Sequence, residues 1–397
     1  MRMTDVAIVG GGLAGSLAAA MLGRAGISAI MIDPHEVYPP DFRCEKLDGV
    51  QVDILRKTGF ADEVLSATTF DRECWVARHG RLLDKRPSDQ HGIFYAPLVN
   101  TIRRLIPADV TRIVAKAKAI TLSDERQIVT LSDGETISAR LVVLANGLNL
   151  ALRKSLGMPR EVLSECHSVS IGFDIKPAAS RIFAFPALTY YAEKLTDQTA
   201  FVTLFPIGTA MRANLFSYRK MHDLWVRTVQ AQPKQMIHAL MPGLSRLIGD
   251  FDVDGEVQVR PIDLCVTEGF RRSGIVLIGD AFSTSCPAAG TGARKALNDV
   301  ERLCNVHIPR WLATPGMSAD KIERFYDDPA KRACDNTSLA KAFKLRSFSL
   351  DPSWPWEARR RLKFYAQYAV GAARERSRRL PAPPSDDASG IPAVTRT

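Results

Sequence analysis

Residues 6–33 read VAIVGGGLAGSLAAAMLGRAGISAIMID, and this stretch decides the fold of the chain. A short apolar strand (6–9) leads into a glycine-rich turn, an Ala- and Leu-rich helix and a second apolar strand (29–32) that ends in Asp33. In such a unit the unpaired N–H groups at the start of the helix lie at its positive end and face phosphates. The order of these elements therefore predicts a dinucleotide site in an α/β domain.

Six residues of this unit are predicted to contact the dinucleotide: Gly10, Gly12, Leu13, Ala14, Gly15 and Asp33. Gly10 permits the tight turn, Gly12 lets the pyrophosphate approach the backbone, and Gly15 lets the helix and strand pack closely. Asp33 ends the second strand, where a carboxylate can accept a hydrogen bond from a ribose hydroxyl. A glycine-rich turn without a ligand is the alternative, and the complete strand–helix–strand context argues against it.

The composition limits the class of protein. The chain has 397 residues, 46% of them hydrophobic, which is enough for one large or two medium domains. Its seven cysteines are scattered and never form a C-x-x-C pair, a pattern typical of reduced thiols in a cytoplasmic protein. The seven histidines are also scattered, so no metal site is expected. No segment approaches the roughly 18 uninterrupted apolar residues of a membrane span.

The net charge of +10 is concentrated near the C-terminus. Residues 341–380 contain eleven Lys or Arg against three acidic residues, so the charge does not indicate a general nucleic-acid surface. Within this segment WPWEARRRLKFYAQYAVGAARERSRRL (354–380) interleaves aromatic and basic residues. Such a helix can lie on an anionic membrane or pack on the protein with its charges in water. We favour packing and keep peripheral membrane contact through 341–380 as the alternative.

Three further segments carry chemistry. Residues 274–281 (GIVLIGDA) form a strand that ends in Gly-Asp, and the loop 286–292 (CPAAGTG) precedes a helix. A carboxylate at a sheet edge suits a polyol chain, and loop N–H groups at a helix start can stabilise negative charge on a ring system. Residues 141–153 (LVVLANGLNLALR) repeat the order of strand, turn and helix, and Arg43 offers a cation near the first site.

With these segments in place, the chain resembles the class A flavin monooxygenases, the p-hydroxybenzoate hydroxylase family, over residues 5–305. In that family the first glycine motif holds the ADP half of FAD, and the second motif meets the ribityl chain and the isoalloxazine. The resemblance implies that FAD is the cofactor and adds these contacts: Arg43, Gly279, Asp280, Pro287, Gly290, Thr291 and Gly292. The flavin-facing loop supplies Pro287, Gly290, Thr291 and Gly292; spacing singles out no catalytic acid or base.

The chain departs from the family pattern at several positions. The family's middle motif reads Asp-Gly-x-x-Ser-x-x-Arg, and here Asn146 and Leu150 replace the Asp and the Ser while Arg153 is kept. That motif is linked to both FAD and NAD(P)H, so the external reductant stays open. Ser283 stands where many members have His, and Asn100 stands where an arginine often begins a helix.

The resemblance implies an FAD-dependent monooxygenase that acts on a small aromatic or hydrophobic molecule. NAD(P)H would reduce the flavin, and a C4a-hydroperoxide formed with O₂ would hydroxylate or epoxidise an aromatic or olefinic substrate. One alternative is a reductase of the geranylgeranyl reductase kind that acts on a C=C bond. A halogenase is less favoured, because its W-x-W-x-I-P signature is absent from the sequence. A third alternative is a flavin-binding protein recruited to RNA or a membrane through 341–380.

The predicted fold is α/β: a Rossmann-type, glutathione reductase-like FAD-binding domain, an interleaved antiparallel β-sheet substrate domain, and C-terminal helices. The FAD-binding domain is assigned to 1–70, 98–165 and 270–305, and the substrate domain to 71–97 and 166–269. Residues 306–380 are assigned to a basic helical segment and 381–397 to a disordered tail. Helices are predicted at 53–65, 98–106, 222–248 with a break at 242–243, 292–304, 321–334 and 356–379, and a strand is predicted around 256–261.

Aromatic residues on the strand-like runs of 168–218 favour core packing, with a substrate cavity as the alternative. Arg212 lies among them and either holds an anionic substrate or is solvated. Cys286, beside Pro287, is interpreted as a small buried filler in preference to a redox thiol or a flavin attachment point.

Overall fold

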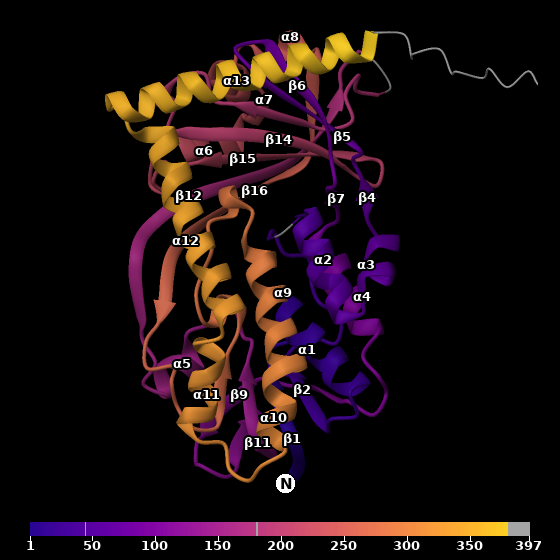
Figure 1. The fold of residues 1–397 in the computed structure, drawn as a ribbon, viewed down its shortest axis with the longest axis vertical. Helices are drawn as coiled ribbons and strands as arrows, with labels where there is room; N and C mark the ends of the chain where they lie inside the picture. The colour runs from indigo at the N-terminus through magenta and orange to yellow at the C-terminus, as the bar shows by residue number, and fades with distance from the viewer. Residues whose placement is uncertain (44, 180–181, 380–397) are drawn as a thin grey trace, which may run out of the picture.

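The computed structural model describes residues 1–43, 45–179 and 182–379, which form a mixed α/β fold with three sheets (Figure 1). Cys44 and the predicted tail 381–397 lie outside the described residues. In Figure 1 the sheet that contains β1 and β11 occupies the lower half, and the sheet of β12 to β16 lies above it.

The first sheet has the order β8-β2-β1-β11-β10-β9, with β17 paired to β11. Its strands are β1 (Arg2–Val9), β2 (Ala29–Asp33), β8 (Thr111–Val114), β9 (Ala117–Thr121), β10 (Gln127–Leu131), β11 (Thr136–Leu144) and β17 (Ile275–Leu277). Strands β8, β2, β1, β11 and β17 are parallel, and β10 and β9 form an antiparallel extension.

Both faces of the first sheet are buried, which explains its continuous apolar strands. Val6 and Ile8 of β1 pack in one hydrophobic cluster with the helices α1 (Leu13–Arg24), α4 (Tyr95–Arg104) and α9 (Gly292–Arg302). The alternate residues Ala7 and Val9 pack on the other face, against β9 and β10. The glycine turn between β1 and α1 is therefore held at the edge of a rigid sheet.

The second sheet has the order β16-β12-β15-β14-β13-β5-β6. Its strands are β5 (Glu73–Arg78), β6 (Arg81–Pro87), β12 (Arg160–Pro177), β13 (Leu188–Tyr191), β14 (Thr199–Ile207), β15 (Ala210–Ser217) and β16 (Phe251–Thr267). One face packs on the helices α6 (Leu224–Ala231), α7 (Pro233–Leu240) and α8 (Leu244–Ile248). A small third sheet joins β3 (Lys46–Leu47), β7 (His91–Gly92) and β4 (Thr69–Phe70).

The pair β12 and β16 is much longer than the sequence predicts. It runs from Arg160, opposite Thr267, to Pro177, opposite Phe251, whereas only 256–261 of β16 was predicted as a strand. Asp252, Asp254 and Gly255 interrupt the apolar pattern of β16, and the register shifts along the pair absorb these irregular positions. These two long strands extend from the second sheet toward the part of the molecule that holds the first sheet (Figure 1).

Several predicted helices are divided in the structure. The single helix predicted at 53–65 is wrong: α2 (Gly49–Thr58) and α3 (Ala61–Ser66) are separated by Gly59, which adopts φ +78° and ends α2. The helix predicted at 321–334 is also wrong. There α11 (Ala319–Tyr326) ends, and α12 (Pro329–Leu350) starts after its N-cap Asp328. The segment 222–248 breaks before Pro233 as well as at the predicted 242–243.

Two long helices complete the fold. The helix α12 packs against α9 and β14, and α13 (Trp354–Arg379) crosses the outer side of the second sheet (Figure 1). Among the described residues, no helix is long and apolar enough to cross a membrane. The six described cysteines are all free thiols.

Candidate cofactor and substrate site

A cavity of about 960 Å³ lies where the first sheet meets the second. This volume is at the upper end of the range for ligand sites, about 300–1,000 Å³. Most of the predicted cofactor residues line it: Gly10, Gly12, Leu13, Ala14, Asp33, Arg43, Gly279, Asp280, Pro287, Gly290 and Gly292. Gly15 and Thr291 are not part of the lining.

The glycine turn has no room for side chains. Gly10 has φ +105°, and a Cβ there would lie 2.6 Å from the carbonyl oxygen of Ala145. A Cβ on Gly15 would lie 1.8 Å from the carbonyl oxygen of Gly10, so Gly15 permits the helix to approach the strand without touching the cavity. The N-cap residue of α1, Gly12, provides no side-chain cap. Backbone N–H groups of α1 therefore face the cavity, a cradle that fits a pyrophosphate.

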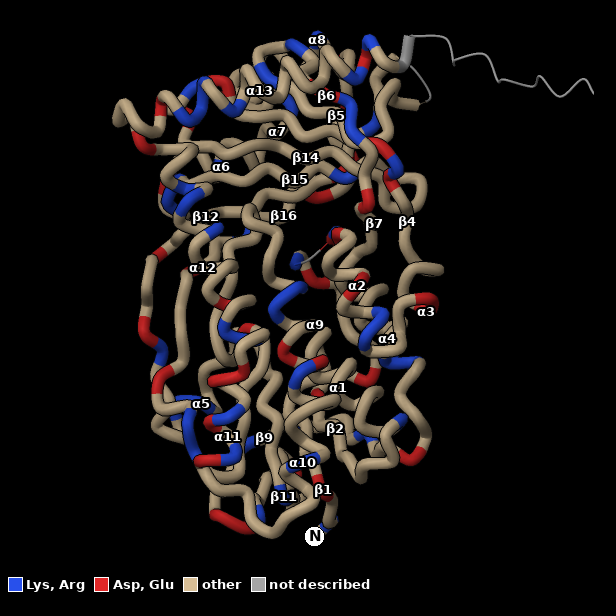
Figure 2. The backbone as a smooth tube through the Cα atoms, viewed as in Figure 1, with Lys and Arg blue, Asp and Glu red and all other residues tan. Residues whose placement is uncertain are grey.

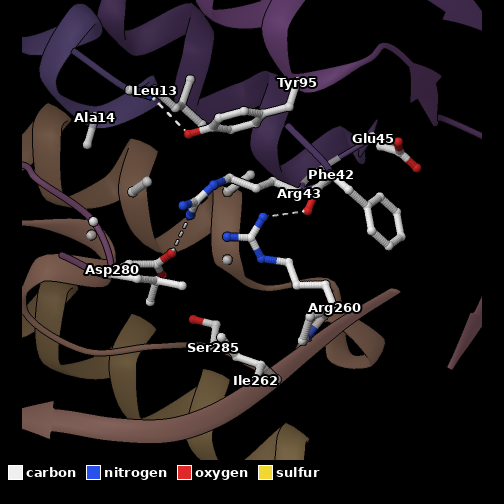
Figure 3. Close-up of a pocket in the computed structure, with 18 of the residues that line it drawn as sticks. Leu13, Ala14, Phe42, Arg43, Glu45, Tyr95, Arg260, Ile262, Asp280 and Ser285 are labelled. Carbon is white, nitrogen blue, oxygen red and sulfur yellow. Dashed lines mark hydrogen bonds and ion pairs between the residues drawn. The ribbon is translucent and has the colours of Figure 1, made fainter. Parts of the chain in front are cut away.

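Tyr95 lies at this helix start, although the sequence did not indicate it. Its hydroxyl accepts a hydrogen bond from the N–H of Leu13 at 3.1 Å (Figure 3). The helix α4 begins at Tyr95, three residues before the predicted start at residue 98, and so places this ring over the turn. Burial raises the pKa of Tyr95 to about 12, so the phenol keeps its proton and can donate it to an acceptor.

The turn is held from behind by Arg103. Its buried guanidinium donates to the carbonyl oxygen of Gly11 at 2.6 Å and pairs with Asp33 at 3.0 Å. Asp33 in turn accepts a hydrogen bond from the N–H of Gly11 at 2.7 Å. Asn100, at the position where an arginine is common in the family, binds the backbone of Tyr38 instead. The helix α4 thus supplies a cation through Arg103, one turn after Asn100.

Arg43 and Asp280 form an ion pair in the lining of the cavity. The guanidinium Nη1 of Arg43 lies 3.0 Å from the Asp280 carboxylate. Figure 3 shows these two side chains pointing toward each other. Asp41 pairs with Arg43 and with Arg260, each at 2.5 Å. Arg260 also donates to the carbonyl oxygen of Phe42 at 2.9 Å. Since Arg260 belongs to β16, these ion pairs link the second sheet to the Gly-Asp turn after β17.

Arg153, the arginine kept from the family's middle motif, is a structural clamp. Its fully buried guanidinium donates to the carbonyl oxygens of Ala281 at 2.6 Å, Asn149 at 2.7 Å and Gly147 at 3.1 Å. It thereby ties the loop after β11 to the Gly-Asp turn after β17. Burial lowers the pKa of Arg153 to about 10.

The two replaced positions of that motif differ in their surroundings. Asn146 lines the cavity, and its amide donates to the carbonyl oxygen of Asn149 at 3.3 Å. Leu150 is exposed at the surface and does not line the cavity. The replacement at Asn146 is therefore the one that can alter contacts to a ligand.

The loop before α9 is closed by an internal turn and anchored on two sides. The N–H of Gly290 donates to the carbonyl oxygen of Pro287 at 2.9 Å, and the Gly290 carbonyl accepts from the Gln51 amide at 3.0 Å. The hydroxyl of Thr291 bonds that of Ser338 on α12 at 2.6 Å, so Thr291 ties the loop to α12 instead of capping α9. The start of α9 at Gly292 thus faces the cavity with its backbone N–H groups.

Two further residues singled out in the sequence, Cys286 and Ser283, lie at or just before this loop. The Sγ of Cys286 is 3.5 Å from the hydroxyl of Ser168, and burial raises the pKa of this thiol. A buried, protonated thiol agrees with its interpretation as a filler. Ser283, at the position of the family's His, accepts a hydrogen bond from the Nζ of Lys295 on α9.

The far end of the cavity is lined by side chains from alternate positions of the second sheet: Ser170, Thr189, Tyr191, Phe201, Thr203, Phe205, Asn214 and Phe216. The C-terminal helices add Lys341 and Leu345 from α12 and Lys363 from α13. The Nζ of Lys363 donates to the hydroxyl of Tyr191 at 3.1 Å. Some of the aromatic residues that the sequence assigned to core packing therefore line a chamber.

Arg212 fits neither of its two sequence interpretations. It is buried, it does not line the cavity, and it donates to both carboxylate oxygens of Glu45 at 2.9 and 3.0 Å. A third acidic contact, to Asp174, is 3.2 Å long. Arg212 therefore neutralises Glu45, a buried carboxylate that itself lines the cavity.

Comparisons with known proteins agree with this geometry. Residues 3–306 match the family described as FAD binding domain. The chain is 22% identical to 3-demethoxyubiquinol 3-hydroxylase of Escherichia coli over 358 residues, which cover 82% of this chain and 86% of that protein. It is 24% identical to digeranylgeranylglycerophospholipid reductase 2 of Methanopyrus kandleri over 318 residues, which cover 74% of each.

Among solved structures, p-nitrophenol 4-monooxygenase from Pseudomonas putida has the same fold, with a TM-score of 0.75 and 16% identity. The match covers 95% of this chain and 96% of that one. The resemblance stated from the two glycine motifs is confirmed by the family match. The chain belongs to the FAD-binding domain family of the class A flavin monooxygenases and is an FAD-dependent oxidoreductase.

Proposed function

We propose that the chain hydroxylates or epoxidises a small aromatic or olefinic molecule, with NAD(P)H as the electron donor and O₂ as the oxygen source. The observation that carries this proposal is the single cavity that starts on the glycine turn and ends on an aromatic sheet face. A dinucleotide cofactor and a hydrophobic substrate can share such a cavity end to end. The division into a discontinuous, glutathione reductase-like cofactor domain and an interleaved substrate domain is part of the same proposal.

The lining residues fit FAD. The N–H groups at the start of α1 and the hydroxyl of Tyr95 would hold the pyrophosphate, and Asp33 would accept from the ribose. Asp280 and Arg43 lie where the ribityl chain would pass, and the loop 287–292 would meet the ring system. When bound, FAD supplies the two-electron chemistry and the activation of O₂.

The protein itself positions the substrate and excludes water. Phe201 and Phe216 form a ring contact at 5.2 Å between centroids, and Tyr191 contacts Phe201 at 5.8 Å, so the chamber has one continuous aromatic wall. Thr203 and Asn214 are register partners on neighbouring strands and place polar atoms beside this wall. The positive end of α9 lies at the opposite side of the cavity and would stabilise negative charge there.

The test uses the purified FAD-loaded protein with NADH or NADPH, a panel of phenols, anilines and prenyl compounds, and ¹⁸O₂. We expect one labelled oxygen atom in the product and faster NAD(P)H oxidation when the right substrate is present. A matched variant is Phe201→Ala, which should keep its FAD while less labelled product forms per NAD(P)H consumed. Product that gains two hydrogens under anaerobic conditions, without label, would overturn the proposal in favour of a C=C reductase.

A further inference from the structure

The last helix, α13, has two very different faces. Its inner face packs closely on the second sheet: a Cβ on Gly371 would lie 2.0 Å from the carbonyl oxygen of Leu83, and Arg374 pairs with Asp84 at 2.7 Å. On the same side, Lys363 contributes to the cavity wall. The contacts with Leu83 and Asp84 hold α13 along β6.

The opposite face of α13 carries large apolar side chains in water. Trp354, Leu362 and Tyr365 are 79%, 72% and 73% exposed. Ala366, Ala369 and Ala373 continue the stripe at helical spacing and are also exposed. We call this set the outer face of α13: Trp354, Leu362, Tyr365, Ala366, Ala369 and Ala373. An exposed apolar stripe of this length marks an interaction surface.

Basic side chains accompany the outer face. The sequence of α13 has eight Lys or Arg against two Glu, and Figure 2 shows these charges along the helix at the outermost end of the molecule. Arg359 is exposed beside the apolar stripe, and Arg376 is exposed at the C-terminal end of the stripe, one turn after Ala373. Two copies of this helix would bring like charges together, so the charge disfavours a second copy as the occupant. An anionic partner is complementary.

We propose that the outer face of α13 docks on an anionic phospholipid surface, with the helix lying in the plane of the interface. Leu362 would enter the acyl boundary, Trp354 and Tyr365 would sit at headgroup level, and Arg359 and Arg376 would meet lipid phosphates. A nucleic acid would use the arginines but would leave the aliphatic and alanine positions in water. The inner face of the docked helix reaches the cavity, so the site would lie at the bilayer, where hydrophobic substrates dissolve.

The proposal is tested by vesicle flotation of the full FAD-loaded chain. We expect binding to phosphatidylcholine vesicles that contain about one third phosphatidylglycerol, weaker binding to phosphatidylcholine alone, and a decrease with added salt. Leu362→Ser/Tyr365→Ser should lower the partition constant by about tenfold or more, because it removes two inserting side chains. Arg359→Gln/Arg376→Gln should weaken binding to the anionic vesicles and reduce its salt dependence.

The matched control is Leu224→Ser on α6, where Leu224 is 73% exposed, the same exposure as that of Leu362 within one per cent. This variant should float like the wild type, and all variants should keep their FAD content and Tm. Flotation that Leu362→Ser/Tyr365→Ser leaves unchanged would overturn the proposal, as would a wild type that does not float. Two other results would also overturn it: a dimer of the wild type in sedimentation velocity that the double variant abolishes, or binding of an oligouridylate RNA that the double variant abolishes.

Discussion

The two ends of the cavity are built in different ways. At the proposed dinucleotide end much of the lining is backbone N–H groups and glycine Cα atoms, and these positions are fixed because a Cβ on Gly10 or Gly15 would collide with the backbone. At the substrate end the contacts are side chains from alternate positions of strands far apart in the sequence. The first end is therefore intolerant of substitution, and the second can change its lining while the sheet remains intact.

The comparison predicts the largest effect for Gly15→Ala. The added Cβ must displace the backbone of Gly10, so we expect a loss of more than about 4 kcal/mol of unfolding free energy and loss of FAD binding. Thermal unfolding and the FAD absorbance of the purified protein measure both. Gly134→Ala is the control: it has φ +90° but open space around the Cβ, so it should cost only backbone strain and keep FAD.

Arg212→Met tests whether the substrate end is as tolerant as the comparison implies. It leaves Glu45 buried without its cation, so we expect a loss of about 3–5 kcal/mol in chemical denaturation. The double variant Arg212→Met/Glu45→Leu should recover most of this stability, because replacing a whole buried pair is often neutral. No recovery in the double variant would mean that the pair, like the glycine turn, is fixed by its geometry.

Arg103→Leu tests the dinucleotide end through a side chain. Asp33 and the carbonyl oxygen of Gly11 lose their buried partner, so we expect about 2–4 kcal/mol of destabilisation and weaker FAD binding in fluorescence titration. The neighbouring Arg104→Leu is the control, since Arg104 is exposed and donates a hydrogen bond to the adjacent Thr101 on its own helix. Equal FAD affinity in both variants would contradict the assigned role of Arg103.

The smallest effect is expected for Phe201→Leu in the aromatic wall. The site can repack around a smaller apolar side chain, so the loss of stability should be about 1 kcal/mol with FAD content unchanged. The preference among the aromatic substrates of the panel should shift, as measured by relative kcat/KM. A variant that loses FAD would show that the two ends of the cavity are not independent.

The contrast between the two ends of the cavity also explains which residues could be predicted from the sequence. Residues 10–33 and 279–292 could be placed because their glycines report a backbone conformation, which is a local property of the chain. Tyr95 and Arg103 could not, since their roles depend on how α4 packs over a turn some eighty residues earlier. A signal was present in the Arg103–Arg104 pair near the end of the helix predicted at 98–106, but either residue could have been the exposed one.

The second sheet was harder to predict than the first. Its strand runs were recognised between 168 and 218, but β16 was assigned less than half of its length. Its polar residues face water on one side, and bulges shift the pairing with β12, so no alternation persists for long. Asn214 and Lys363 could not be assigned to the chamber in advance, because their positions depend on which strands pair with β15 and on how α13 packs across the sheet.

The strand β17 is synthesised long after β11, the strand with which it pairs. The end of β11, residues 142–144, pairs with β17 at Ile275–Leu277, and the intervening residues form most of another sheet. At ordinary ribosomal rates this partner emerges on the order of ten seconds later. During that interval a nascent chain exposes an apolar strand edge, the kind of surface that aggregates or recruits a chaperone. We therefore expect cofactor loading to begin only once α9 has left the ribosome.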